Sequence, residues 1–390
     1  MLTDAPLGRI EFAHFLRGIA AGSVLTHHFF YMLWNKPEII GGLIAQPGLR
    51  ALIDNTPHFS VSDFGVPNFW GHFGVALFFL ISGFVIPFSA SSLTPAGFVI
   101  ARVLRIWPTY VVGLSITLAC LIINTARAGT AFPYTIRDVL SHYLILPRWP
   151  SLTPPIDGII WTLEIELFFY SFCFLMNRKL KTFDRSIYLF AVASAPLAVV
   201  ASLATPAMLR SGWPIFPPVH WASSMMQFLP FLLVGTAFHY FYRGRLGLRD
   251  LAALHAALLV AFVLSWRFGL MRDDGWSGPV SYLIAYAAFA SAFAWRETIG
   301  SLPKFLRQPF SRLADISYPL YVVHGILGYS IIAASLQAGF GAGLALILAV
   351  SAVAALSVTL HVAVERPSQA MGKTIARRFR SPARPLQEPR

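Results

Sequence analysis

The chain has 390 residues, of which 56% are hydrophobic and only 12% are charged. Soluble globular domains carry about 25% charged residues, so most of this surface cannot face water. The 30 Lys and Arg residues outnumber the 17 Asp and Glu residues, and the net charge of +13 is distributed between long apolar runs. This distribution is typical of membrane topology, and it excludes a soluble enzyme, a nucleic-acid-binding protein and a disordered chain.

Ten apolar runs approach the length of about 20 residues that a membrane-spanning helix needs. They cover roughly residues 10–34, 69–89, 98–124, 158–177, 186–207, 219–242, 251–269, 279–295, 314–337 and 342–364. Cys120 and Cys173 lie inside such runs, so we expect neither a disulfide framework nor a metal site. The sequence predicts an all-α, polytopic transmembrane helix bundle of about ten spans, which forms a single domain over residues 1–390.

The basic residues give the bundle an orientation. With a cytoplasmic N-terminus, 21 of the 30 Lys and Arg residues fall on the cytoplasmic side, eight fall on the other side, and Arg17 lies within a span. Because cytoplasmic loops are enriched in Lys and Arg, we expect both termini in the cytoplasm, with a basic tail at about 366–390. The longer outer connections, 35–68 and 125–157, are rich in Pro, Trp and Phe. They are interpreted either as packing at the membrane interface or as a lid over an extracytoplasmic site.

Arg17 and His28 are ionisable residues inside the first run, and such residues are candidates for function. At about 100° per residue, their separation of eleven positions places both side chains on one helix face, ~16 Å apart along the axis. His27 lies about 80° away from Arg17, so His28 is the better candidate to face the same cavity. Alternatively, Arg17 snorkels to the cytoplasmic surface and His28 is a hydrogen-bonded packing residue.

Small and basic residues mark the second and third runs. Ser82 and Gly83 predict a close contact between helices. Arg102 and Arg105 lie one turn apart at the cytoplasmic end of their run. They either bind an anionic phosphate through charge-assisted hydrogen bonds or simply follow the positive-inside rule.

Two carboxylates in the fourth run are hard to explain by contact with lipid. Glu164 and Glu166 lie about 200° apart on a helix, so they cannot both face one cavity, whereas Glu166 and Tyr170 share a face. The ninth run carries a drifting stripe of polar aromatic residues, which are Tyr318, Tyr321 and His324.

Together these segments resemble the acyltransferase-3 family of integral membrane acyltransferases. Six short motifs appear in the family's order over nearly the whole chain: Leu16-Arg17-Gly18 with ten residues between Arg17 and His28, Phe78-Phe-Leu-Ile-Ser82-Gly83-Phe84, Arg102-x-x-Arg105 with Trp107-Pro108 and Tyr110, Trp161-Thr-Leu-x-x-Glu166 with Tyr170, Ser317-Tyr318-x-Leu-Tyr321-x-x-His324, and Glu365-Arg366-Pro367. The sequence departs from the family at Ala76, where many members carry an acidic residue, and Glu164 has no assigned role.

The resemblance implies a membrane-embedded O-acyltransferase that moves an acyl group, usually acetyl, from cytoplasmic acyl-CoA to a carbohydrate hydroxyl. Acetyl-CoA would be a co-substrate, and no permanently bound cofactor is expected. The implied acceptor is an exopolysaccharide, a lipopolysaccharide, a periplasmic glucan or a lipid-linked glycan, and the implied location is a bacterial inner membrane. A transporter or flippase for a glycan, and an acyltransferase acting on a small natural product, are the alternatives.

The resemblance and the layout together assign roles to eight residues. His28 is expected to be the general base for the acceptor hydroxyl, with a covalent acyl-enzyme as the alternative. Arg17 is assigned to the donor or to an ion pair with Glu166, and Glu166 otherwise orients His28 or binds the acceptor. Arg102 and Arg105 are expected to hold the phosphates of CoA. The residues expected to line the substrate cavity are Trp161, Tyr170 and His324.

Overall fold

The computed structural model describes residues 10–144, 155–211 and 216–379. Within these ranges the regular elements are helices and no strand occurs, so the expected all-α fold is confirmed. The expected spans each contain a long helix: α1 (Glu11–His27), α5 (Phe69–Ser92), α6 (Pro95–Ala128), α8 (Ile160–Leu175), α10 (Ser186–Ser211), α11 (Phe216–Tyr242), α12 (Leu248–Phe268), α13 (Ser277–Ala294), α16 (Ser317–Gln337) and α17 (Ala342–Leu360).

Eight helices in the described part of the chain are long and apolar enough to cross a membrane. The helices α1, with 17 residues, and α8, with 16 residues, are shorter. However, α1 continues directly into the π-helical turn η1 (His28–Met32) and then α2 (Leu33–Asn35). The protein is therefore a multi-pass integral membrane protein built as a helical bundle.

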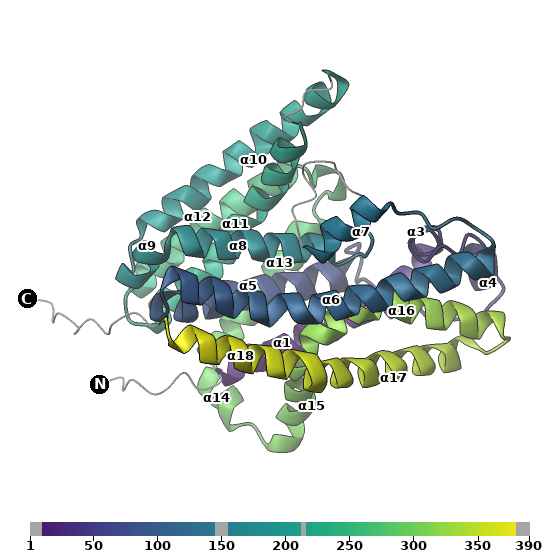
Figure 1. Cartoon of the computed structure of the whole chain (residues 1–390). Helices are drawn as coiled ribbons and strands as arrows, with labels where there is room; N and C mark the ends of the chain where they lie inside the picture. Colours follow the sequence, from purple (N-terminus) through teal and green to yellow (C-terminus); the bar gives the residue numbers. More distant parts are fainter. Residues whose placement is uncertain (1–9, 145–154, 212–215, 380–390) are drawn as a thin grey trace, which may run out of the picture.

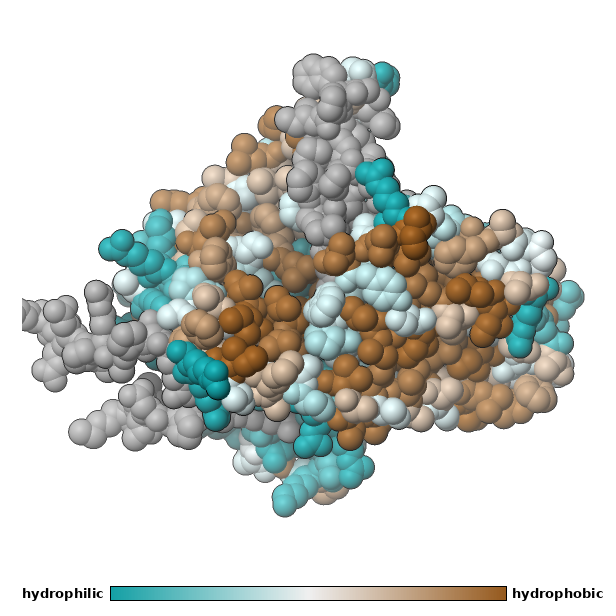
Figure 2. Space-filling view, in the orientation of Figure 1, coloured by the Kyte–Doolittle hydropathy of each residue, from teal (hydrophilic) through white to brown (hydrophobic). Residues whose placement is uncertain are grey.

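The long helices α5, α6, α16 and α17 run roughly along one direction and form one side of the bundle (Figure 1). The helices α10, α11 and α12 pack on one another at a different inclination and project from this side (Figure 1). Large apolar side chains on the outer helices are exposed, for example Leu189 at 72% and Ile347 at 63%. Figure 2 shows an extensive hydrophobic surface along the bundle, with hydrophilic residues concentrated towards its ends. This surface suits contact with lipid acyl chains.

Shorter helices occupy the connections: α3 (Pro37–Leu43), α4 (Leu49–Asp54), α7 (Ile136–Tyr143), α9 (Asn177–Thr182), η2 (Arg272–Asp274), α14 (Arg296–Ser301) and α15 (Lys304–Asp315). The helix α17 continues without a break through the π-helical turn η3 (His361–Glu365) into α18 (Arg366–Arg377). Of the two long connections predicted to lie on the outer side, the first contains α3 and α4, and the second contains α7. Residues 145–154 of the second lie outside the described residues. Whether either connection forms a lid stays a prediction.

The amphipathic helix α15 was not foreseen, because its charged residues look like an ordinary basic loop in the sequence. It packs against α1, where Arg307 forms an ion pair with Glu11 at 3.1 Å and the ring of His14 lies 3.0 Å from the carbonyl oxygen of Ser311. The ninth expected span begins at residue 314, whereas α16 begins at Ser317 after α15 has ended.

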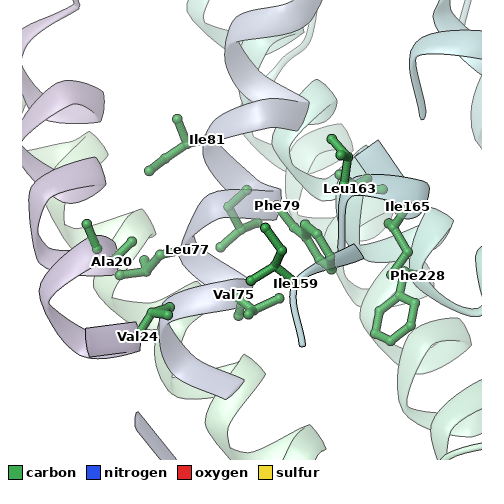
Figure 3. Packing of buried hydrophobic residues seen from close by; sticks show 14 of the residues in the cluster. Ala20, Val24, Val75, Leu77, Phe79, Ile81, Ile159, Leu163, Ile165 and Phe228 are labelled. Carbon is green, nitrogen blue, oxygen red and sulfur yellow. The ribbon is translucent and has the colours of Figure 1, made fainter. Parts of the chain in front are cut away.

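The centre of the bundle is a continuous apolar core shared by α1, α5, α8 and α11. In Figure 3, Ala20 and Val24 of α1 lie near Leu77 of α5, and Phe79 of α5 lies among Ile159, Leu163 and Phe228. The helices α5 and α11 approach most closely at Gly83 and Gly235, where an added Cβ would collide with the backbone of the facing helix. Close helix contact at Gly83 is therefore confirmed.

Candidate active site

Two cavities lie inside the bundle along α16. The larger measures about 70 Å³, which is enough for several water molecules, and the smaller measures about 10 Å³, about the room of one water. The larger is lined by Arg17, Val75, Phe78, Phe79, Ser82, Tyr110, Ile159, Thr162, Leu163, Glu166, Leu232, Ser317, Tyr318, Tyr321 and Val322. The smaller is lined by Ala21, Val24, Leu25, Ser317, Leu320, Tyr321 and His324. The two cavities share Ser317 and Tyr321, so they meet at these side chains.

Arg17 lines the larger cavity rather than snorkelling out of the bundle. Its Nε donates a hydrogen bond to Ser317 Oγ at 2.7 Å, and its guanidinium carbon lies 5.8 Å from the centre of the Phe78 ring. The hydroxyl of Ser317 in turn donates to the backbone oxygen of Ala314 at 2.8 Å. A fixed cation is thus held at the wall of the larger cavity.

Glu166 is the carboxylate that lines this cavity, while Glu164 is buried and lines neither. The hydroxyl of Tyr170, one turn along α8, donates a hydrogen bond to Glu166, as their shared helix face predicts. Among the described contacts Arg17 and Glu166 form no direct ion pair, although both face the same space. A polar ligand placed between them would meet both charges.

Arg102 and Arg105 lie beside the larger cavity rather than in its wall. The guanidinium of Arg102 donates a hydrogen bond to Ser89 and lies 5.3 Å from the centre of the Tyr170 ring. Arg105 precedes Ile106, whose carbonyl oxygen accepts a 2.9 Å hydrogen bond from the lining residue Tyr318. Neither arginine is among the residues that line the cavity, and their role in CoA binding stays a prediction.

His28 and Arg17 both contact α16, as expected for two residues on one face of α1. The Nδ1 atom of His28 lies 2.6 Å from the hydroxyl oxygen of Tyr329, and its ring centre lies 4.7 Å from that of His324. The neighbouring His27 points elsewhere, because its ring lies against α5 at Gly71. The preference for His28 over His27 as the residue near the cavity is thus supported by the packing.

His324 is almost fully buried and lines the smaller cavity. Its Nδ1 lies within 3.0 Å of the carbonyl oxygen of Leu320 and 2.9 Å of that of Tyr321. Ser317 and Tyr321 thus separate the larger cavity, with Arg17 and Glu166, from the smaller one, which is lined by His324 but not by His28.

The remaining predicted lining residues lie further from the cavities. Trp161 packs near Phe228, with ring centres 6.0 Å apart, and is not among the residues that line either cavity. Tyr170 approaches the larger cavity only through its hydrogen bond to Glu166. Their assignment to substrate binding stays a prediction.

Sequence reasoning missed Tyr329 as a neighbour of His28, and it placed Ser82 only in a helix contact although this residue lines the larger cavity. The regular spacing of Tyr318, Tyr321 and His324 was the available signal for the α16 wall. Tyr329 lies five positions beyond His324, and nothing in the sequence sets it apart from a core aromatic residue.

The fold and the cavities define a class: the protein is a multi-pass helical membrane protein with charged and titratable side chains around internal cavities. The family described as an acyltransferase domain, that of the acyltransferase-3 type, matches residues 10–366 of the chain. The chain therefore belongs to the acyltransferase-3 family and is a membrane acyltransferase. Neither the curated proteins nor the solved structures contain a match to it.

Proposed function

We propose that this protein is an O-acyltransferase that moves an acetyl group from cytoplasmic acetyl-CoA to a hydroxyl of a carbohydrate at a bacterial inner membrane. The observation that carries the proposal is a pair of adjoining cavities that share Ser317 and Tyr321 as lining residues. One is lined by Arg17 and Glu166, and the other by His324, whose ring centre lies 4.7 Å from that of His28. A donor that enters beside the arginines would thus meet basic groups deeper in the membrane.

The chemistry of acyl transfer matches the side chains present. The acceptor oxygen forms a bond to the thioester carbonyl carbon, the carbon–sulfur bond breaks, and CoA leaves as a thiolate. One imidazole takes the proton of the acceptor hydroxyl and returns it to the thiolate, so the products are an ester and free CoA. We assign His28 to this reacting pair on the strength of its place on α1 and its contact with His324.

The other ionic residues suit the binding of the donor. Arg102 and Arg105 lie one turn apart on α6 near the larger cavity. Their guanidinium groups would bind the phosphates of CoA by charge-assisted hydrogen bonds. Arg17 would meet a polar group of the pantetheine arm, and Glu166 would bind either this arm or the acceptor. The acceptor that fits this chemistry is a polyhydroxylated glycan, free or linked to lipid.

Radiolabelled acetyl-CoA incubated with the purified protein tests the class of activity. An acyltransferase releases free CoA and transfers the label to an acceptor or to water, whereas a transporter or flippase leaves acetyl-CoA intact. Intact acetyl-CoA in the presence of a total glycan extract would contradict the proposal. A heat-denatured sample of the same protein is the control for spontaneous hydrolysis.

The acceptor class is tested in cells. In a strain that lacks this protein, mass spectrometry of surface glycans should show the loss of an acetyl group, which the intact protein restores. A glycan profile that does not change would exclude a surface carbohydrate and direct the search to small hydroxylated molecules.

A further inference from the structure

The hydrogen bonds of His324 determine where its proton lies. Both neighbours of Nδ1 are backbone carbonyl oxygens, those of Leu320 and Tyr321, and carbonyl oxygens only accept hydrogen bonds. Nδ1 therefore carries the hydrogen, and in the neutral ring Nε2 presents a bare lone pair. This Nε2 is buried and has no hydrogen-bond partner among the described residues. Buried acceptors are rarely left unsatisfied, so the lone pair is available for a ligand at the smaller cavity.

The hydrogen bonds of His28 place the hydrogen of its neutral ring on the other nitrogen, Nε2. The hydroxyl of Tyr329 is buried, and its one described hydrogen bond joins it to His28 Nδ1 at 2.6 Å. If this nitrogen carried the hydrogen, the hydroxyl proton of Tyr329 would be left without a described acceptor. The arrangement that satisfies the buried hydroxyl has Tyr329 donating to Nδ1, so the hydrogen of the neutral His28 ring lies on Nε2.

The two rings therefore offer complementary nitrogen atoms. His324 offers an acceptor and His28 a donor, and their ring centres lie 4.7 Å apart in an edge-on arrangement. His324 lines the smaller cavity, and His28 lies one turn along α1 from Val24 and Leu25, which line it as well. Addition of a hydroxyl to a carbonyl needs this combination: a base for the proton, and a donor for the oxygen that becomes negative.

We infer that His324 Nε2 accepts the proton of the attacking hydroxyl, while His28 Nε2–H donates a hydrogen bond to the thioester carbonyl oxygen. The inference rests on the proposed function, and it reverses the role that the sequence suggests for His28. The proton held by His324 passes to the departing CoA thiolate when the carbon–sulfur bond breaks. Tyr329 is then a positioning residue, because it fixes the ring of His28 without touching the substrate.

Glutamine variants of the two histidines separate the roles, because a side-chain amide donates and accepts hydrogen bonds but is not a base at neutral pH. The measurement is the release of CoA from acetyl-CoA by the purified protein, with water or a glycan extract as the acceptor. His324→Gln and His324→Ala should both lower kcat about 100-fold or more. His28→Ala should lower kcat by a similar factor. His28→Gln keeps an N–H donor, so its kcat should be about tenfold or more above that of His28→Ala.

Two controls make the comparison specific. His255 also lies near a tyrosine hydroxyl, that of Tyr286 at 3.1 Å, but it belongs to α12, away from both cavities. His255→Gln should leave kcat close to that of the wild type. In His324→Ala, added imidazoles should restore turnover in the order of their basicity, which the loss of a merely structural side chain would not produce. Melting temperatures confirm that each variant is folded.

The outcomes are distinguishable. A wild-type protein that releases no CoA overturns the proposed function, and this inference with it. Wild-type turnover with an active His324→Gln overturns the inference alone, as does a folded His324→Ala that imidazoles do not rescue. A His28→Gln variant no more active than His28→Ala overturns the donor role of His28.

Discussion

His28 is the first residue of η1, the π-helical turn that follows α1. Such turns are rare, and they are frequent at functional sites because one wider turn changes the direction of the side chains that follow. His27 and His28 point to different helices because consecutive residues of a helix lie about 100° apart. The wider turn therefore acts on the residues after His28, among them Phe29, whose ring lies against Gly328 of α16.

Loss of the His28 imidazole should strongly reduce the rate of acyl transfer without unfolding the protein. The expected effect of His28→Ala is a fall of about 100- to 10,000-fold in the rate of CoA release, the usual range for a group that assists the transfer of a proton or stabilises the developing charge. His255→Ala removes a buried histidine that likewise contacts a tyrosine hydroxyl, and it should retain activity. Full activity in a folded His28→Ala protein would remove His28 from the mechanism.

For single residues, the sequence predicts the direction in which a side chain points better than it predicts the residues that the side chain contacts. The spacing of Arg17 and His28 was sufficient to place both against one helix, because the 3.6-residue period holds along α1. Tyr329 lies 301 positions from His28, and such a distant contact depends on how α16 packs on α1. The stripe of Tyr318, Tyr321 and His324 indicated a polar face on α16, but only the packing shows that Arg17 bonds to Ser317, which lies outside the stripe.

The contact between α5 and α11 shows how element packing positions the site. The two helices meet at Gly83 and Gly235, and the hydroxyl of Thr236 donates a 3.0 Å hydrogen bond to the backbone oxygen of Gly83. Small residues allow helix backbones to approach closely in membranes, where packing rather than the hydrophobic effect holds helices together. Ser82, which precedes Gly83 on α5, lines the larger cavity, so the contact between α5 and α11 also holds part of the cavity wall in place.

Gly83→Ala should push α5 away from α11. Overpacking of a tight core typically costs about 1–3 kcal/mol, so the melting temperature of the purified protein in detergent should fall measurably. Gly343→Ala is the matched control, because an added Cβ at this position in α17 meets open space. Equal melting temperatures for Gly83→Ala and Gly343→Ala would contradict the close approach.

On α6, the pair Arg102 and Arg105 should act on donor affinity rather than on the chemical step. The double variant Arg102→Ala with Arg105→Ala should raise the KM for acetyl-CoA about tenfold or more, since each charge-assisted hydrogen bond is worth about 1.5–3 kcal/mol. Arg127→Ala removes a guanidinium from the far end of the same helix and should leave KM unchanged. An unchanged KM in the double variant would identify these arginines as topology signals only.

Helices were predictable from apolar length, but their boundaries and the surface helices were not. The expected run 98–124 lies inside α6, which begins at Pro95 and ends at Ala128, because helices continue past the hydrocarbon into polar residues. The amphipathic α15 escaped prediction since its apolar side is completed by α1 and not by its own sequence neighbours. Such an element becomes recognisable only with its partner in place.

For the whole molecule, the distribution of Lys and Arg predicts that both termini lie in the cytoplasm. A green fluorescent protein fused after residue 390 should fluoresce, because it folds in the cytoplasm, and alkaline phosphatase at the same position should be inactive. Alkaline phosphatase inserted after Gly129, in the predicted outer connection, should be active. The reverse pattern of reporter activity would show that the bundle has the opposite orientation, with Arg102 and Arg105 on the side of the membrane that lacks CoA.

The all-α bundle was evident from composition, because a chain with so little charge has few other ways to satisfy its backbone in a membrane. Cavities are a different matter. They arise where the side chains of several helices fail to fill space, and this depends on helix angles that no single helix encodes. The larger cavity needs residues from α1, α5, α6, α8, α11 and α16 at once.

The shared wall of the two cavities has a consequence for the membrane itself. Ser317 and Tyr321 stand between the larger cavity and a smaller one with room for about one water molecule. Any larger group that moves from the larger cavity towards His324 must displace these side chains. On the function proposed above, they would move aside for the acyl group and otherwise keep the two cavities apart, which limits the leak of ions through the bundle.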